Sequence, residues 1–171
     1  MNGRCHFTKL SAAVWLLALG LLAPGPGACG EERAPPLAIR AIAEVESQST
    51  RGGREIVKLT PADRLVPGDR VLYTLEVRNM SAVPLDSPSV SHRIPEHMQY
   101  VEDSAVGPGA AVSYSVDGGG RFARPENLTV PLPGGRVRPA VAADYTNIRW
   151  RLKNSLKPNS VAFVRFRALV K

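Results

Sequence analysis

The sequence predicts an all-β fold, an antiparallel β-sandwich of about seven to nine short strands. Two observations predict it. After residue 36, apolar residues recur at every second position in most segments, which is the period of a strand with one buried face. The segments are separated by turns rich in Pro and Gly, of which the chain has 15 each. Beyond residue 30 no sustained 3.6-residue apolar period with caps occurs, so we expect no long helix.

The first predicted strands run from residue 37 to residue 79. Apolar residues alternate between Leu37 and Val45, which predicts a strand with one buried face. A polar turn over 48–54 and a short strand over 55–60 follow. The residues Val66-Pro67-Gly68-Asp69 predict a type II turn, since Pro presets φ and Gly tolerates a positive φ. The clearest strand comes next, over 70–79.

Further strands are predicted on both sides of a long loop. They cover 89–94, 98–101, 112–116, 145–152 and 162–170. A hairpin signal, Asp117-Gly118, ends the third of them. The Pro-rich segment 123–144 predicts an irregular surface excursion with one short strand near 128–132. We expect Trp150, Tyr73 and Phe166 to form the aromatic centre of the core.

The amino terminus predicts export. Arg4 and Lys9 precede an apolar run over 10–22, in the order of a secretion signal. This run is too short to span a bilayer core, which needs about 20 residues. We expect a signal peptide over 1–30, a linker over 31–36 and one domain over 37–171. Two cleavage sites stay open: after Gly30, or before Cys29, which would then carry a lipid.

Cysteine use and charge restrict the chemistry. Cys5 and Cys29 are the only cysteines. A cut after Gly30 removes both, which leaves a domain without disulfides and excludes thiol catalysis and cysteine zinc sites. The cut also removes Arg4 and Lys9 and no acid, so the formal charge falls by two from +7 to +5. We interpret the remaining positive charge as mainly solvated surface.

Several motifs occur in one order along the chain. They are Val66-Pro67-Gly68-Asp69, Tyr73-Thr74 in a strand that ends at Asn79, Ile94-Pro95 with Met98, Ile148-Arg149-Trp150, and Leu156-Lys157-Pro158-Asn159-Ser160. The order resembles the bacterial conserved repeat domain, domain of unknown function eleven, over about residues 60–171. The resemblance implies an immunoglobulin-like sandwich of exported and cell-surface proteins, and it supplies no catalytic residue. His92 stands where that family usually has Asp, Asn159 replaces a turn Gly, and the domain occurs once, so we do not expect a long stalk.

Few residues are candidates for catalysis. His92 and His97 are candidate metal ligands, but a metal site usually needs three or more converging ligands, which favours a surface or turn role. Glu102 and Asp103 are adjacent carboxylates, and neighbouring residues of a strand point to opposite faces. The nucleophile and phosphate-loop motifs that we searched for are missing. We therefore expect no enzyme, no cofactor and no catalytic residue.

One set of residues is a candidate binding surface. Alternation in the last two strands places their arginines outward, and we predict that they share one sheet face with an exposed phenylalanine. The set is Arg149, Arg151, Phe163, Arg165 and Arg167. A solvated sheet face is the alternative, and we expect no nucleic-acid partner. The triplets Asn79-Met80-Ser81 and Asn127-Leu128-Thr129 match a glycosylation pattern, and we interpret them as turn residues.

These observations predict an exported, non-enzymatic β-sandwich protein of the periplasm, the cell surface or the secreted fraction. We expect it to be a structural or accessory binding subunit at the bacterial cell envelope or surface. The alternative is an adhesive module that binds glycans or anionic polymers through the arginine-bearing face. The expected partner is an envelope or surface protein or a glycan, and contact with a membrane is expected only if Cys29 is lipidated.

Overall fold

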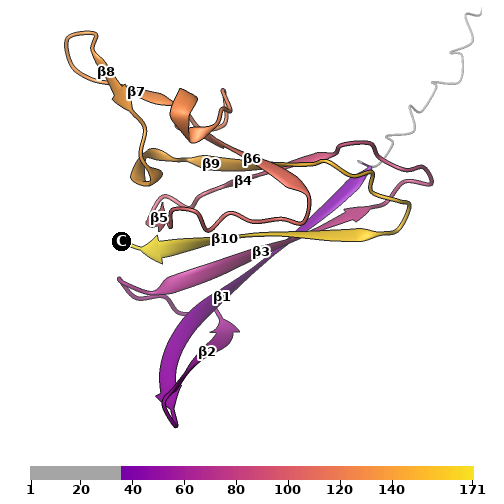
Figure 1. Cartoon of the computed structure of the whole chain (residues 1–171), viewed down its shortest axis with the longest axis horizontal. Coiled ribbons are helices and arrows are strands. Elements are labelled where there is room, and N and C mark those ends of the chain that lie inside the picture. The colour runs from indigo at the N-terminus through magenta and orange to yellow at the C-terminus, as the bar shows by residue number, and fades with distance from the viewer. Residues whose placement is uncertain (1–35) are drawn as a thin grey trace, which may run out of the picture. The chain divides into compact units, whose positions relative to one another are not determined.

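The computed structural model describes residues 36–171, which belong to one compact unit. The described chain is all-β with antiparallel sheets (Figure 1). The predicted signal peptide, Cys29 and most of the predicted linker lie outside the described residues. Within residues 36–171, no helix is long and apolar enough to cross a membrane.

Two sheets make up the body of the protein. One has the strand order β2-β1-β3-β10-β5 and the other the order β4-β9-β6. In the first sheet the strands are β1 (Leu37–Arg51), β2 (Arg54–Pro61), β3 (Arg70–Asn79), β5 (Met98–Tyr100) and β10 (Val161–Val170). In the second they are β4 (Ser89–Arg93), β6 (Ala110–Ser115) and β9 (Asn147–Leu152). The strands predicted over 55–60, 70–79, 89–94, 98–101, 112–116, 145–152 and 162–170 are therefore confirmed within a few residues.

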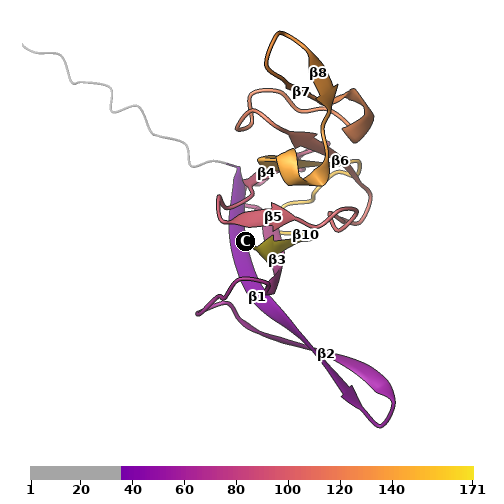
Figure 2. The same ribbon diagram turned by 90° about the vertical axis from the view of Figure 1, so that its left-hand side faces the viewer.

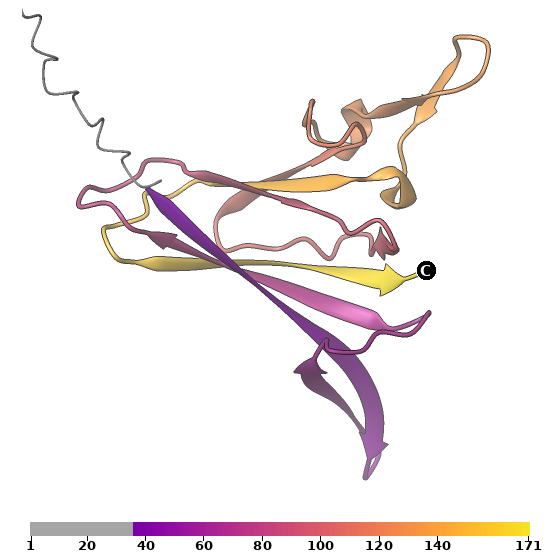
Figure 3. The same ribbon diagram turned by 180° about the vertical axis from the view of Figure 1, so that it is seen from behind.

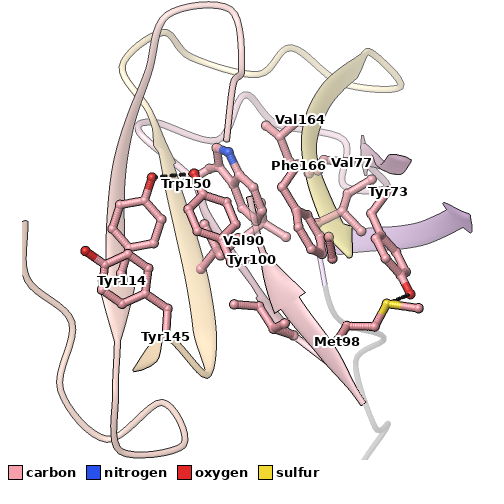
Figure 4. Close-up of a cluster of buried hydrophobic side chains, with 14 of the residues drawn as sticks. Tyr73, Val77, Val90, Met98, Tyr100, Tyr114, Tyr145, Trp150, Val164 and Phe166 are labelled. Carbon is pink, nitrogen blue, oxygen red and sulfur yellow. Dashed lines mark hydrogen bonds between the residues drawn. The ribbon is translucent and has the colours of Figure 1, made fainter. Parts of the chain in front are cut away.

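The core lies between these sheets, because alternate residues of β3, β9 and β10 point toward one another. Trp150 and Phe166 have no exposed surface, and Tyr73 is 8% exposed. The Phe166 and Tyr73 rings stack with centroids 4.7 Å apart, and Trp150 lies 6.0 Å from Phe166 (Figure 4). The Tyr73 hydroxyl donates a hydrogen bond to the Met98 sulfur at 3.0 Å. The predicted aromatic centre is thus confirmed.

Three further tyrosines close the core near β5 and β6. The hydroxyls of Tyr100 and Tyr114 lie 2.9 Å apart, and Tyr114 stacks on Tyr145 with centroids at 4.5 Å (Figure 4). The backbone N–H of Ala105 donates to the Tyr100 hydroxyl at 3.0 Å. Burial and the bond to Tyr100 raise the pKa of Tyr114 far above its ordinary value. Tyr114 therefore stays neutral, and the bond from Ala105 to Tyr100 holds the 101–105 segment against the core.

Two turns have the backbone geometry that their sequences favour. Gly68 has φ 93°, and the Asp69 N–H donates to the Val66 carbonyl at 3.0 Å, as a type II turn requires. Asn159 has φ 58°, and the Ser160 N–H donates to the Lys157 carbonyl at 3.1 Å. This second turn carries the chain from β9 in one sheet to β10 in the other.

The hairpin of β1 and β2 differs from the prediction. β1 continues through the predicted polar turn to Arg51, and only Gly52 and Gly53 reverse the chain. No residue of β1 is fully buried, and Ile39 is 49% exposed. The prediction of one buried face holds only in part, because Leu37 and Ala43 pack against the core while Ile39 does not. Figure 2 shows the hairpin extending beyond the other strands.

The Pro-rich excursion is more ordered than predicted. It contains two short 3-10 helices, Pro125–Asn127 and Ala142–Asp144, and a two-stranded hairpin of β7 (Thr129–Pro131) and β8 (Val137–Pro139) (Figure 3). Arg138 forms two hydrogen bonds with the Asp144 carboxylate, at 2.6 and 2.7 Å. These bonds lower the pKa of Asp144 and link β8 to the second 3-10 helix.

Candidate binding surfaces

The outer face of the five-stranded sheet carries a surface hollow. Directly opposite residues in a sheet share a face, and Arg167 lies opposite Leu72 while Arg165 lies opposite Thr74. The core residues of β3 are Val71, Tyr73, Leu75 and Val77. The intervening residues Leu72 and Thr74 and the two arginines of β10 therefore face away from the core.

A groove of about 630 Å³ runs over this face. Arg70, Leu72, Arg165 and Arg167 line it from β3 and β10. Val57 and Leu59 of β2 line it from the hairpin, and the segment Val101–Ser104 completes the lining. Val57 is 53% exposed and Leu59 42% exposed. The groove therefore offers apolar and charged groups side by side.

Only part of the charge in the groove is compensated. The Arg167 Nε donates to both carboxylate oxygens of Glu46, at 2.9 and 3.0 Å, and the Glu46 side chain is 7% exposed. Within residues 36–171, neither Arg70 nor Arg165 forms an ion pair. These two guanidinium groups are free to bind a ligand.

Glu102 and Asp103 also line the groove, and their position differs from the prediction. They lie in a turn after β5, where Asp103 has φ 56°, and not on a strand. The argument that alternation along a strand separates them is therefore wrong. Both carboxylates are exposed on the groove rim, so a partner that binds there meets acidic as well as basic groups.

A smaller hollow of about 470 Å³ adjoins the groove. Val106, Gly107, Pro108, Phe163 and Arg165 line it, and Arg165 lines both hollows. Phe163 is 45% exposed, so its ring is accessible from solvent. An open aromatic ring beside an unpaired guanidinium is the arrangement that binds flat or anionic groups by stacking and charge.

The predicted arginine face is divided between two sheets. Phe163, Arg165 and Arg167 lie on β10, and their register with β3 places them on the groove side. Arg149 and Arg151 lie on β9, which pairs with β4 and β6 in the other sheet. The prediction that all five share one face was wrong, because the turn between β9 and β10 crosses from one sheet to the other.

Arg149 is engaged within its own sheet. Its guanidinium lies 3.6 Å from the centroid of the Phe122 ring, a cation–π contact. Arg151 is exposed on the same outer face and lies opposite Ser89 and Ala111. The three-stranded sheet therefore presents two arginines that are separate from the groove.

The two predicted metal candidates lie in different surroundings. His92 of β4 is half-buried, and its ring centroid lies 5.9 Å from that of Tyr73 and 5.6 Å from that of Phe166. His97 is exposed in the turn before β5. Within residues 36–171, no group of three or more histidine, cysteine or acidic side chains is placed to hold a metal ion. The environment of His92 is that of a core aromatic residue.

His92 makes stability depend on pH. Burial lowers the pKa of His92 in the folded protein. The unfolded chain has an ordinary histidine pKa of about 6.5 and binds a proton below it, while folded His92 resists protonation. The free energy of unfolding therefore falls as the pH drops below about 6.5, by at most about 1.4 kcal/mol per pH unit.

Urea unfolding at a series of pH values measures this effect. We expect His92→Gln to flatten the loss of stability between about pH 6.5 and pH 5. The matched control is His97→Gln, which changes the exposed histidine and leaves the buried ring in place. If His92→Gln kept the pH dependence of the wild type, the loss of stability at low pH would come from other groups.

Comparison with known proteins gives no relative. No family model matches the chain, no curated protein matches it, and no solved structure matches it.

Sequence reasoning missed most of the groove lining, including Val57, Leu59, Arg70 and Leu72. One signal for Leu72 was present: a large apolar residue at the position between Val71 and Tyr73, where the alternation of the strand calls for a polar one. Leu72 is 7% exposed, although it lies on the outer face. The side chains of the groove therefore cover it.

Proposed function

We propose that this chain is an exported, non-enzymatic protein that acts by binding, as a structural or accessory subunit at the bacterial cell envelope or surface. The apolar run behind Arg4 and Lys9 supports export. We further propose an immunoglobulin-like β-sandwich of the conserved repeat type. The motif order from Val66 to Ser160 supports that proposal, as does a core formed between two antiparallel sheets.

The groove on the five-stranded sheet carries the proposal of a binding role. Exposed apolar side chains beside unpaired charges are typical of protein interfaces, where arginine is enriched and partly apolar contacts form the centre. Here Val57 and Leu59 supply the apolar contacts, and Arg70 and Arg165 supply the unpaired guanidinium groups. A partner protein with apolar and acidic side chains at its interface fits this surface.

A matched pair of charge reversals tests the groove. We expect Arg165→Glu to reduce capture of the envelope partner at least about tenfold, because it reverses a charge at the centre of the binding surface. Arg151→Glu makes the same change on the outer face of the other sheet and should keep wild-type capture. Each variant is used to capture proteins from an envelope fraction, and quantitative mass spectrometry compares the amounts.

One outcome of this experiment would contradict the proposal. If Arg165→Glu and Arg151→Glu capture the same proteins in the same amounts as the wild type, the groove is not the binding surface. Urea unfolding of both variants checks that neither change alters the fold. Arg151 and Arg165 are both exposed on strands, so equal and small losses of stability are expected.

The hollow beside Phe163 favours a second candidate, an adhesive module for glycans or anionic polymers. The open ring of Phe163 can stack on a sugar, and Arg165 can bind its acidic group. The same variants distinguish the two candidates when acidic polysaccharide replaces the envelope fraction. Polysaccharide binding that depends on Arg165 and weakens with added salt supports the glycan role, and binding that ignores ionic strength argues against it.

A further inference from the structure

β2 is the longest edge strand in the described chain. The other edge strands are short: β5 covers Met98–Tyr100, β4 covers Ser89–Arg93, and β6 has a further bridge to Ala123. β2 spans Arg54–Pro61, and within residues 36–171 its only ladder is the one with β1. Long edges with unpaired N–H and C=O groups are templates for pairing with another strand.

The distal part of this hairpin is a ribbon of two strands only. Pairing between β1 and β3 ends at Val45 opposite Val71, and beyond it β1 pairs with β2 alone. Ile56 and Val57 point to opposite faces of the ribbon and are 43% and 53% exposed. An isolated two-stranded ribbon is marginally stable in water, and a third strand stabilises it.

We propose that the third strand is β2 of a second copy of this chain, paired antiparallel across a two-fold axis. In such a symmetric pair, one residue of β2 lies opposite the same residue of the second copy, and this residue defines the register. The two registers with the longest overlap are centred on Val57 and on Lys58, and they pair residues 54–60 and 55–61. This inference goes beyond the proposed binding role of the groove.

Charge selects the register centred on Val57. A centre at Lys58 would place two ammonium groups directly opposite each other, which destabilises a sheet. It would also bring Pro61, which lacks a donor, into the ladder. A centre at Val57 places Arg54 opposite Thr60 and Ile56 opposite Lys58 of the second copy. Only in the Val57 register does the longest overlap avoid both defects.

The hairpin geometry leaves room for the second copy. The hairpin extends beyond the other strands, away from β7 and β8 (Figure 2). Gly52 and Gly53 form its tip, and a Cβ atom added to either would meet no atom within 4 Å. In the Val57 register Gly53 lies opposite Pro61 of the second copy. Because Gly53 has no side chain, none can collide with the proline ring. Two five-stranded sheets then form one continuous sheet.

Disulfide trapping tests the register with adjacent positions. The full chain carries Cys5→Ser and Cys29→Ser, so that only the introduced thiol reacts. In Val57→Cys the two sulfurs belong to directly opposite residues, about 5 Å apart at Cα, which permits a disulfide. In Ile56→Cys the two Cα atoms are offset by two residues and lie about 8 Å apart, beyond the range of a disulfide. We expect a covalent dimer of the first variant and none of the second.

Sedimentation equilibrium tests the dimer without a cross-link. Val57→Lys places two like charges at the centre of the pair, so we expect the dimer dissociation constant to rise at least about tenfold. The control is Val137→Lys, at an apolar residue of β8 that is 62% exposed, and it should leave the constant unchanged.

Three results would overturn the proposal. They are a wild-type chain that stays monomeric at every concentration, efficient trapping through Ile56→Cys, and equal dissociation constants for Val57→Lys and the wild type. A monomer in which envelope extract protects the β2 amides from hydrogen exchange would assign the edge to a different protein.

Discussion

Replacing Phe166 with Ala lowers the free energy of unfolding by about 4 kcal/mol. The side chain has no exposed surface and belongs to the core cluster. Its ring stacks on Tyr73 with the centroids 4.7 Å apart. The ring centroids of Trp150 and His92 lie 6.0 and 5.6 Å from that of Phe166. Truncation removes these contacts and leaves a cavity that the three rigid rings cannot fill. Urea unfolding followed by tryptophan fluorescence measures the loss.

Phe163 provides a matched control on the same strand. It lies three residues before Phe166, so its side chain points to the opposite face, where it is 45% exposed. We expect Phe163→Ala to cost less than about 1 kcal/mol, since nearly half of its surface is already in contact with water. Equal losses for the two variants would contradict the assignment of the β10 faces.

The alternation of apolar residues predicted the central strands well. In β3 and β10 the alternating residues Val71, Tyr73, Val164 and Phe166 are buried in the core cluster. The same pattern held only in part for β1, where Leu37 and Ala43 pack against the core but Ile39 alternates correctly and is still half exposed. A strand pattern shows which residues share a face, but whether another sheet covers that face depends on the width of that sheet.

The prediction of one arginine-bearing face was wrong for a related reason. Arg151 and Arg165 are close in sequence and separated by a tight turn, which is the usual sign of a hairpin. Here β9 pairs with β4 and β6, while β10 pairs with β3 and β5. The turn joins two sheets, and turn residues such as Asn159 look the same in both situations. Sheet membership depends on long-range pairing that no local pattern records.

The two glycosylation-like triplets illustrate the same limit. In sequence they are equivalent, yet Asn79 has no exposed surface and Asn127 is exposed in a short 3-10 helix. The Asn79 Nδ2 donates to the carbonyls of Val83 and Leu156 at 2.8 and 2.9 Å. Its Oδ1 accepts hydrogen bonds from the backbone N–H and the hydroxyl of Ser81, at 2.9 and 2.7 Å. Asn79 thus joins the end of β3 to the loops on either side of it, and the folded protein cannot carry a glycan there.

We therefore expect Asn79→Ala to lower the free energy of unfolding by about 3 kcal/mol, from the lost hydrogen bonds and the buried cavity. Asn127→Ala, the matched control in the other triplet, should stay within about 0.5 kcal/mol of the wild type. A small effect of Asn79→Ala in urea unfolding would mean that water replaces the amide without loss.

Asn79→Asp separates the hydrogen bonds from the packing. The aspartate keeps the size of the side chain and the acceptor for Ser81, but it places an oxygen where the amide nitrogen faces the carbonyls of Val83 and Leu156. At neutral pH this buried charge without a donor should cost at least as much as the alanine. As the pH falls, the carboxyl group binds a proton and can again donate one hydrogen bond, so the stability of this variant relative to wild type should rise. A relative stability that does not change with pH would show that the loss comes from packing and not from the missing donor.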